Sequence, residues 1–139
     1  MNKILVEVSV GELLDKISIL EIKKEKIKDS EKLKFINDEY NVLKDQFNMN
    51  VKSDEKIDKL FKSLKEINSK LWVIEDDKRL CEKNSDFGEE FIKLSRDVHF
   101  LNDERAKIKL EMNNHTGSKI KEIKEYTSCL LYTSDAADE

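Results

Sequence analysis

The chain has 139 residues, of which 40% are charged, and its 30 acids and 26 bases give a net charge of -4. This length suits one domain with one core, and the mixed signs of charge do not favour nucleic-acid binding. No uncharged run approaches the roughly 20 residues of a membrane span, and the apolar opening Ile4 to Val8 is too short for a signal-peptide core. The absence of proline and the presence of only three glycines favour helix throughout. We therefore expect a cytoplasmic, all-α protein that binds neither nucleic acid nor membranes.

The first half of the chain predicts a helical hairpin. Ser9 and Glu12 have the spacing of a capping box, which predicts a helix that starts at Val10. Apolar residues then recur three and four positions apart in two stretches, namely Leu13, Ile17, Leu20 and Ile27, and Leu33, Ile36, Tyr40, Leu43 and Phe47. When the two stretches are paired antiparallel, the two residues of each pair lie equally far along the chain from Ser30. Lys24 then lies opposite Ile36. We expect a hairpin about 27 Å long that turns near Ser30.

The second half predicts a longer hairpin of the same kind, after a linker at Asn48 to Asp54. Its two heptad stripes pair in a register centred on Asp86, which has capping-box spacing to Glu89. At 1.5 Å per residue this hairpin would run about 40 Å. The stripes are Ile57, Leu60, Leu64, Ile67, Leu71, Ile74, Lys78 and Cys81, and Phe91, Leu94, Val98, Leu101, Arg105, Ile108 and Met112.

Further apolar residues flank both stripes and widen them beyond the seam of a two-stranded coiled coil. They include Ile19, Ile22, Phe35, Phe61, Trp72, Leu80, Ile92 and Phe100. This surplus favours either a four-helix bundle or a dimer of hairpins.

The two ends of the chain are less regular. Ile4, Val6 and Val8 alternate as in a short strand, and residues 119–126 are equally consistent with a partner strand or a short helix. Cys129 to Glu139 resembles translated sequencing adapter, which makes residues 1–128 the helical domain and 129–139 a non-native tail. Isoleucine, lysine and asparagine supply 46 residues, as an AT-rich genome would produce. Without the tail Cys81 is the one cysteine, and its apolar helix phase predicts a buried thiol.

The candidate site lies between Leu71 and Ala106, which holds all three arginines of a chain that otherwise has 23 lysines. A guanidinium group can bind a carboxylate or phosphate through two hydrogen bonds. Arg105 falls on the stripe opposite Ile67, where an unpaired charge costs roughly 3–5 kcal/mol, so it needs carboxylates or a ligand. Glu21 on the first helix is a candidate structural partner. The remaining candidates share the two helices with Arg105 and are Arg79, Arg96, Glu75, Asp76, Asp77, Asn102 and Asp103.

Catalytic and metal-binding signals are weak. Asp86-Phe87-Gly88 repeats a kinase triplet without the other kinase motifs, so we interpret it as a helix-entry turn. His99 with Asp103, and Glu111 with His115, have the spacing of helical metal ligands, but the two pairs point in different directions and no Glu-x-x-His motif accompanies them. We predict no catalytic residue, no metal and no cofactor.

Four segments resemble an uncharacterised bacterial family, the domain of unknown function family 6165. They are VEVSVGELLDKISILEIKKEKI at Val6 to Ile27, LWVIEDDKRLCE at Leu71 to Glu82, DFGEEFIKLSRDV at Asp86 to Val98, and the spaced pattern from Asn102 to Lys109. The similarity covers residues 4–126, and Tyr126 corresponds to a tyrosine that closes the family pattern. Lys78 departs from the family, which typically has an aliphatic residue there. The resemblance implies a small bacterial protein and carries no activity with it.

Two functions compete at this point. The leading hypothesis is a module that acts through protein contacts, with a protein partner or as a homodimer, and whose arginines form a structural network with Asp and Glu. The alternative is a small binder or enzyme for an anionic metabolite, in which Arg79, Arg96 and Arg105 hold carboxylate or phosphate groups.

Overall fold

The computed structural model describes residues 3–125, and nearly all of this range after Ser9 is helical. Four helices follow one another, with bounds α1 (Val10–Lys26), α2 (Ser30–Asn50), α3 (Glu55–Lys83) and α4 (Glu89–Thr116). This confirms the predicted all-α architecture.

The ends of the helices follow from local capping chemistry. The Ser9 hydroxyl accepts from the backbone N–H of Glu12 at 3.0 Å, so α1 starts at Val10 as predicted. Asp54 caps α3 in the same way, accepting from the N–H of Ile57 at 2.9 Å. The α4 helix begins differently: its N-cap is Gly88, and the Asp86 side chain accepts from the Gly88 N–H instead of capping the helix. At the other end of α4, Gly117 takes the left-handed conformation (φ 68°) that favours glycine.

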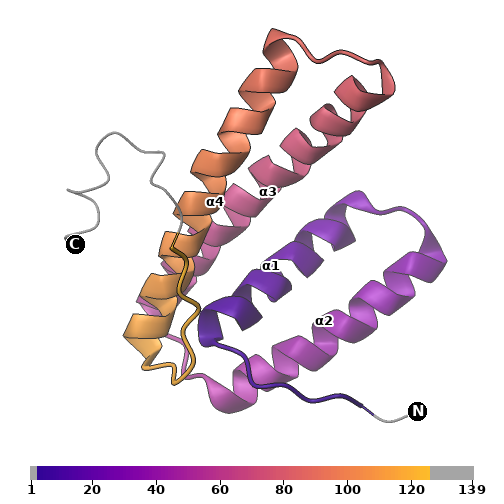
Figure 1. Ribbon diagram of the computed structural model, residues 1–139. Helices are drawn as coiled ribbons and strands as arrows, with labels where there is room; N and C mark the ends of the chain where they lie inside the picture. The colour runs from indigo at the N-terminus through magenta and orange to yellow at the C-terminus, as the bar shows by residue number, and fades with distance from the viewer. Residues whose placement is uncertain (1–2, 126–139) are drawn as a thin grey trace.

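The helices form two antiparallel hairpins, a short one of α1 and α2 and a long one of α3 and α4 (Figure 1). The short hairpin turns at residues 27–29, directly before the predicted centre Ser30, and the long one turns at residues 84–88, centred on Asp86 as predicted. The linker is shorter than predicted, at residues 51–54. Every residue of the predicted stripes is buried or half-buried except Lys24, whose ammonium lies 4.0 Å from the centre of the Tyr40 ring. Cys81 is buried.

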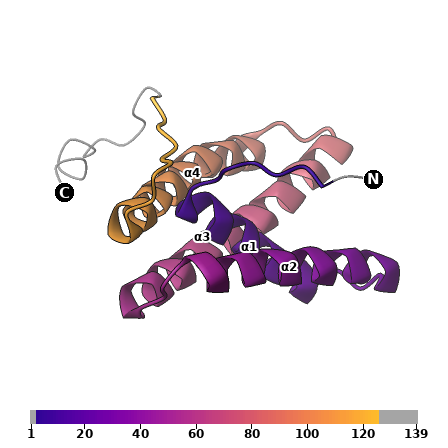
Figure 2. The same cartoon turned by 90° about the horizontal axis from the view of Figure 1, so that it is seen from below.

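The α1 helix is the centre of the molecule. It packs against each of the other three helices, whereas α2 packs against α1 alone. Seen from below, α1 lies between α2 and the long hairpin (Figure 2). The bundle is therefore a long hairpin with α1 on one of its faces and α2 outside α1. Its main core contains Leu13, Leu14, Ile17, Phe47, Ile57, Leu64 and Met112.

The flanking apolar residues divide into two groups. Ile22 is buried and Phe61 packs against the core, which explains the width of these stripes. Phe35, Leu80 and Ile92 are exposed to 75%, 56% and 55%. Part of the predicted surplus thus remains on the surface.

The ends differ from the expectation. Within residues 3–125 the structure contains no strand, and both the segment before Ser9 and residues 118–125 are irregular. The predicted alternatives for residues 119–126, strand or helix, are therefore not found up to Glu125. Tyr126 and the predicted non-native tail lie outside the described residues.

Candidate functional site

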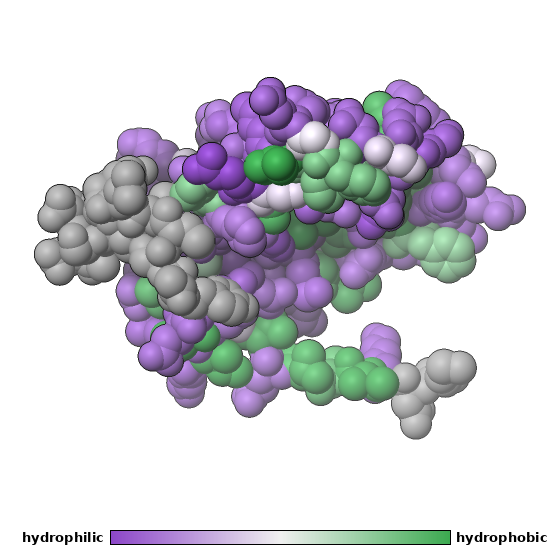
Figure 3. Space-filling model, turned by 45° about the horizontal axis from the view of Figure 1, so that its top comes forward, coloured by the Kyte–Doolittle hydropathy of each residue, from purple (hydrophilic) through white to green (hydrophobic). Residues whose placement is uncertain are grey.

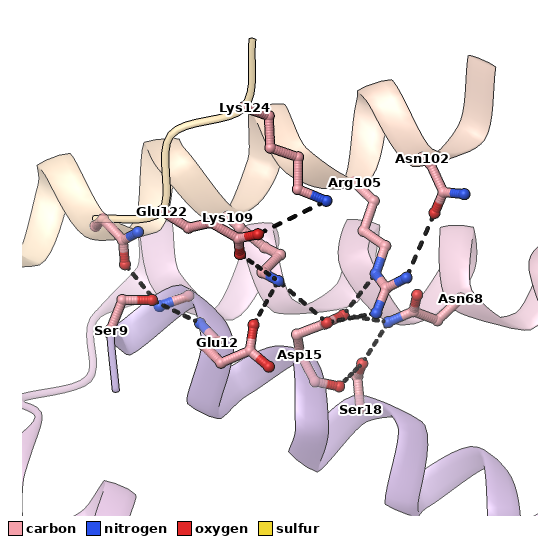
Figure 4. A network of polar contacts seen from close by, with 12 residues as sticks. Ser9, Glu12, Asp15, Ser18, Asn68, Asn102, Arg105, Lys109, Glu122 and Lys124 are labelled. Carbon is pink, nitrogen blue, oxygen red and sulfur yellow. Dashed lines mark hydrogen bonds and ion pairs between the residues drawn. The ribbon is translucent and has the colours of Figure 1, made fainter. Parts of the chain in front are cut away.

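A buried carboxylate, Asp15 of α1, is the centre of the polar contacts between α1 and the long hairpin (Figure 4). Arg105 of α4 grips it with two bonds, Nε to Oδ1 at 3.0 Å and Nη2 to Oδ2 at 2.6 Å. Asn68 of α3 donates from Nδ2 to Asp15 Oδ1 at 2.8 Å and to the Ser18 hydroxyl at 2.8 Å. Ser18 in turn donates to the backbone carbonyl of Asp15 at 2.7 Å. One carboxylate thus links three helices.

Lys109 extends the network toward the end of the chain. Its Nζ lies 2.7 Å from Glu12 Oε2, 3.4 Å from Asp15 Oδ2 and 3.6 Å from a carboxylate oxygen of Glu122. The Lys109 side chain is 11% exposed, and three carboxylates surround its charge. The irregular segment after α4 is therefore held against α4 by an ion pair as well as by its chain connection.

A glycine allows α1 to approach α4 closely enough for these bonds. Gly11 lies against the α4 backbone, where an added Cβ would sit 2.6 Å from the Lys109 carbonyl oxygen. The Gly11 N–H also donates to Asn113 Oδ1 at 2.7 Å. Because a free N–H in the first turn of a helix needs an acceptor, the Asn113 amide both satisfies α1 and fixes its position on α4.

Burial and pairing act in opposite directions on the pKa of Asp15. Burial is the largest influence and would raise it, but the bonds from Arg105 and Asn68 and the charges of Arg105 and Lys109 together hold the pKa below its ordinary value of 3.8. The Asp15 hydrogen bonds raise the pKa of Arg105. Burial would lower the pKa of Lys109, yet Glu12 and Asp15 raise it above 10.5. All three groups are therefore charged at neutral pH.

Every acceptor position in the centre of this network is used by the protein itself. Both oxygens of Asp15 accept two contacts each, and no buried side-chain nitrogen or oxygen among the described residues lacks a partner. A carboxylate filled in this way holds helices together, and it offers no free lone pair for a substrate proton. The described part of the chain has no group of three potential metal ligands. None of its helices has the length and apolar character of a membrane span.

The structure separates the predicted site residues. It brings together Arg105 and Asn102, whose Oδ1 accepts from Arg105 Nη1 at 3.4 Å. Arg79 forms an exposed pair with Glu75 in the outer half of α3, with Nε 3.2 Å from Oε1. Arg96, Asp76 and Asp77 are exposed, Asp103 is half-buried, and no ion pair among the described residues joins any of these four to Arg105. Ligand binding by these residues remains a prediction.

Glu21 does not pair with Arg105, whose carboxylate partner is Asp15. Instead, Glu21 accepts from the Tyr40 hydroxyl of α2 at 3.2 Å and lies 3.1 Å from Lys65 Nζ of α3. Lys65 also contacts Glu25 at 2.9 Å. Burial raises the pKa of Tyr40, and the Glu21 charge raises it further. Glu21 thus forms a second polar link between α1 and its neighbours.

The face of α1 toward the long hairpin carries the network residues that the sequence analysis missed, Asp15 and Ser18, and their surroundings Asn68, Lys109 and Asn113 on α3 and α4 were missed as well. Gly11, Leu14, Asp15, Ser18 and Ile22 recur three and four positions apart, and all five are buried. This face lies roughly opposite the Leu13–Ile17–Leu20 stripe that packs on α2. In the sequence, small residues and one acid at helical spacing marked this face of α1.

Residues 4–138 match the model of the Family of unknown function (DUF6165). The matched range includes most of the segment that we predicted to be non-native, and that prediction remains untested. Neither the curated proteins nor the solved structures contain a match.

Proposed function

Since the chain belongs to DUF6165, a family of unknown function, we propose from its own geometry that it is a protein-interaction or assembly module. The Asp15 network is its internal frame and holds the helices together, and its exposed apolar surfaces bind the partner. The alternative, a binder of anionic metabolites, has less support because the guanidinium of Arg105 is already committed to Asp15.

One observation carries this proposal: an exposed apolar stripe along α2. Phe35, Val42 and Met49 are 75%, 59% and 75% exposed and recur every seven residues. Seven-residue spacing keeps them on one side of the helix, which is the pattern of a surface that packs against another helix. The opposite side of α2 already packs on α1.

The charges beside the stripe indicate the kind of partner. Its flanking positions are mostly acidic and comprise Glu31, Asp38, Glu39 and Asp45, with Lys32 as one base beside Phe35, all exposed. Two α2 helices would bring these carboxylates together, and like charges across an interface are unfavourable. The stripe therefore suits an amphipathic helix with basic flanks on another protein.

Affinity capture with matched variants tests the proposal. We expect at least one protein to be captured by the wild-type chain and by Leu80→Glu, but by neither Phe35→Glu nor Val42→Glu, and to dissociate at raised salt. Leu80 is the control because it is equally apolar and 56% exposed but lies on α3. Circular dichroism would establish that all four chains are folded. Capture that does not depend on the stripe, together with a monomeric wild-type chain, would contradict the proposed function.

A further inference from the structure

The segment before α1 is an extended arm whose apolar side chains have no cover. All residues from Lys3 to Val8 are exposed, and Ile4, Leu5 and Val6 are exposed to 89%, 88% and 74%. The arm runs away from α1 (Figure 1), and the green side chains next to the grey N-terminal residues stand clear of the body (Figure 3). So many adjacent apolar residues in water indicate an interaction site.

The long hairpin has a matching apolar groove. It is an open hollow of about 650 Å³ between α3 and α4. Its apolar lining is Val73, Ile74, Phe100 and Leu101, and its rim includes Glu66 and Lys70.

This groove lies on the face of the hairpin that α1 does not cover. On α3, Glu66 and Lys70 are each two residues from Asn68, which bonds α1. On α4, Phe100 is nine residues from Lys109, which also bonds α1. At 100° per residue, Glu66 and Lys70 point about 160° away from Asn68, and Phe100 points about 140–180° away from Arg105 and Lys109.

The arm cannot lie in the groove of its own chain. Its root at Val10 and Gly11 is tied to Ser118 and Asn113, at the level of the last turns of α4. Leu101 lies about 12 Å further along α4 than Lys109, and the groove is on the far side of the hairpin. Extended chain advances about 3.3 Å per residue, so Val8 stays close to the root and only the tip could approach.

We propose that the arm, residues 3–8, docks in the α3–α4 groove of a second copy of the chain. This inference rests on the proposed function and names one partner. In an extended arm Ile4, Val6 and Val8 share one side, which can face the apolar lining. Lys3 and Glu7 lie on the other side of the arm, from which their long side chains can reach back toward the rim charges Glu66 and Lys70. Neither rim residue forms an ion pair within residues 3–125. Reciprocal exchange of two arms gives a closed two-fold dimer, the commonest symmetric assembly.

Sedimentation equilibrium of the full-length chain tests the exchange. We expect a mass of twice 16.3 kDa for the wild type, and monomers for Val6→Glu and for Val73→Lys. The chain that carries both substitutions should regain the dimer, because the new charges meet across the interface. Leu80→Lys, on α3 but outside the groove, should remain dimeric.

The outcomes show whether the arm binds a second copy of the chain. A monomeric wild-type chain, a dimer that survives Val6→Glu, or a double variant that remains monomeric would overturn the arm exchange. If Phe35→Glu lost the dimer while Val6→Glu and Val73→Lys kept it, the arm exchange would also be overturned. The proposed function would stand in that case, because the α2 stripe would then be the interface. Positions 6 and 73 are 74% and 48% exposed, so the fold should tolerate these changes. Ile4→Glu provides a second arm variant if Val6→Glu fails to fold by circular dichroism.

Discussion

Removing the charge of Asp15 should destabilise the protein more than any exposed ion pair does. Asp15→Asn keeps the size of the side chain but places an amide against Arg105 and leaves two cations without their shared carboxylate. The Asp15 side chain is 2% exposed and that of Arg105 29%, and breaking a buried pair costs roughly 3–5 kcal/mol. Because water reaches part of Arg105, we expect the lower end, about 3 kcal/mol. For a chain of 139 residues this corresponds to a fall in Tm of about 10 °C.

Urea denaturation followed by circular dichroism would measure this loss, with Glu75→Gln as the control. Glu75 and Arg79 form an ion pair of 56% and 76% exposed side chains, so Glu75→Gln should change the free energy of unfolding by less than about 0.5 kcal/mol. The variant that combines Asp15→Asn with Arg105→Met should be more stable than the two separate losses predict, with a coupling of about 1–3 kcal/mol. Additive losses, or an Asp15→Asn variant as stable as Glu75→Gln, would refute the reasoning.

Three further predictions follow from the same contacts. Gly11→Ala should cost about 1–3 kcal/mol in a denaturant melt because its Cβ meets the α4 backbone at 2.6 Å, whereas Gly88→Ala, with a side-chain atom at 3.5 Å, should be nearly neutral; equal losses would contradict the close approach. The pKa of Asp15 is lowered in the folded state, so its contribution is complete above the ordinary value of 3.8 and disappears as pH falls through the folded value. Melts from pH 6 to pH 2 should therefore show a steeper acid loss for the wild type than for Asp15→Asn, and parallel curves would exclude this linkage. Tyr40→Phe should lose about 1 kcal/mol by chemical denaturation because it removes the hydroxyl that donates to Glu21. A variant as stable as the wild type would contradict a stabilising role for this bond.

The sequence allowed the hairpins to be predicted because their stripes are local and repetitive. Leu13 and Ile17 recur at helical spacing whatever else the chain does, and one antiparallel register satisfies both stripes of each hairpin. The turn of the second hairpin at residues 84–88 agrees with the register centred on Asp86. Periodicity therefore predicted which faces meet within each hairpin.

The site was harder to predict because it depends on how the two hairpins cross. Arg105 was expected to need a carboxylate, which is a local argument, but the choice between Glu21 and Asp15 depends on which face of α1 meets α4. Gly11 contributes to that choice, because its lack of a side chain lets the backbones of α1 and α4 approach. The three arginines lie on one hairpin, yet only Arg105 lies where α1 crosses it.

The same crossing explains why part of the surface stays apolar. Because α1 occupies one face of the long hairpin, the opposite groove and the outer side of α2 have no partner within residues 3–125. Stripes wider than a two-helix seam predicted additional packing, and only some of these apolar residues lie in the core. The remaining apolar surface is the basis of the proposed assembly.

The central claim is that the polar network is an internal frame and not a ligand site. It is tested by whether the Arg105 guanidinium group stays bound to Asp15 when an anion is added. With three arginines in the chain, the Nε–Hε signals of a ¹⁵N-labelled sample can be assigned by mutation, and exposed Arg79 and Arg96 serve as internal references. We predict that the Arg105 signal exchanges slowly with water and does not move when phosphate or citrate is added in excess. A saturable shift of Arg105, larger than those of Arg79 and Arg96, would show that it leaves Asp15 to bind an anion and would contradict the account.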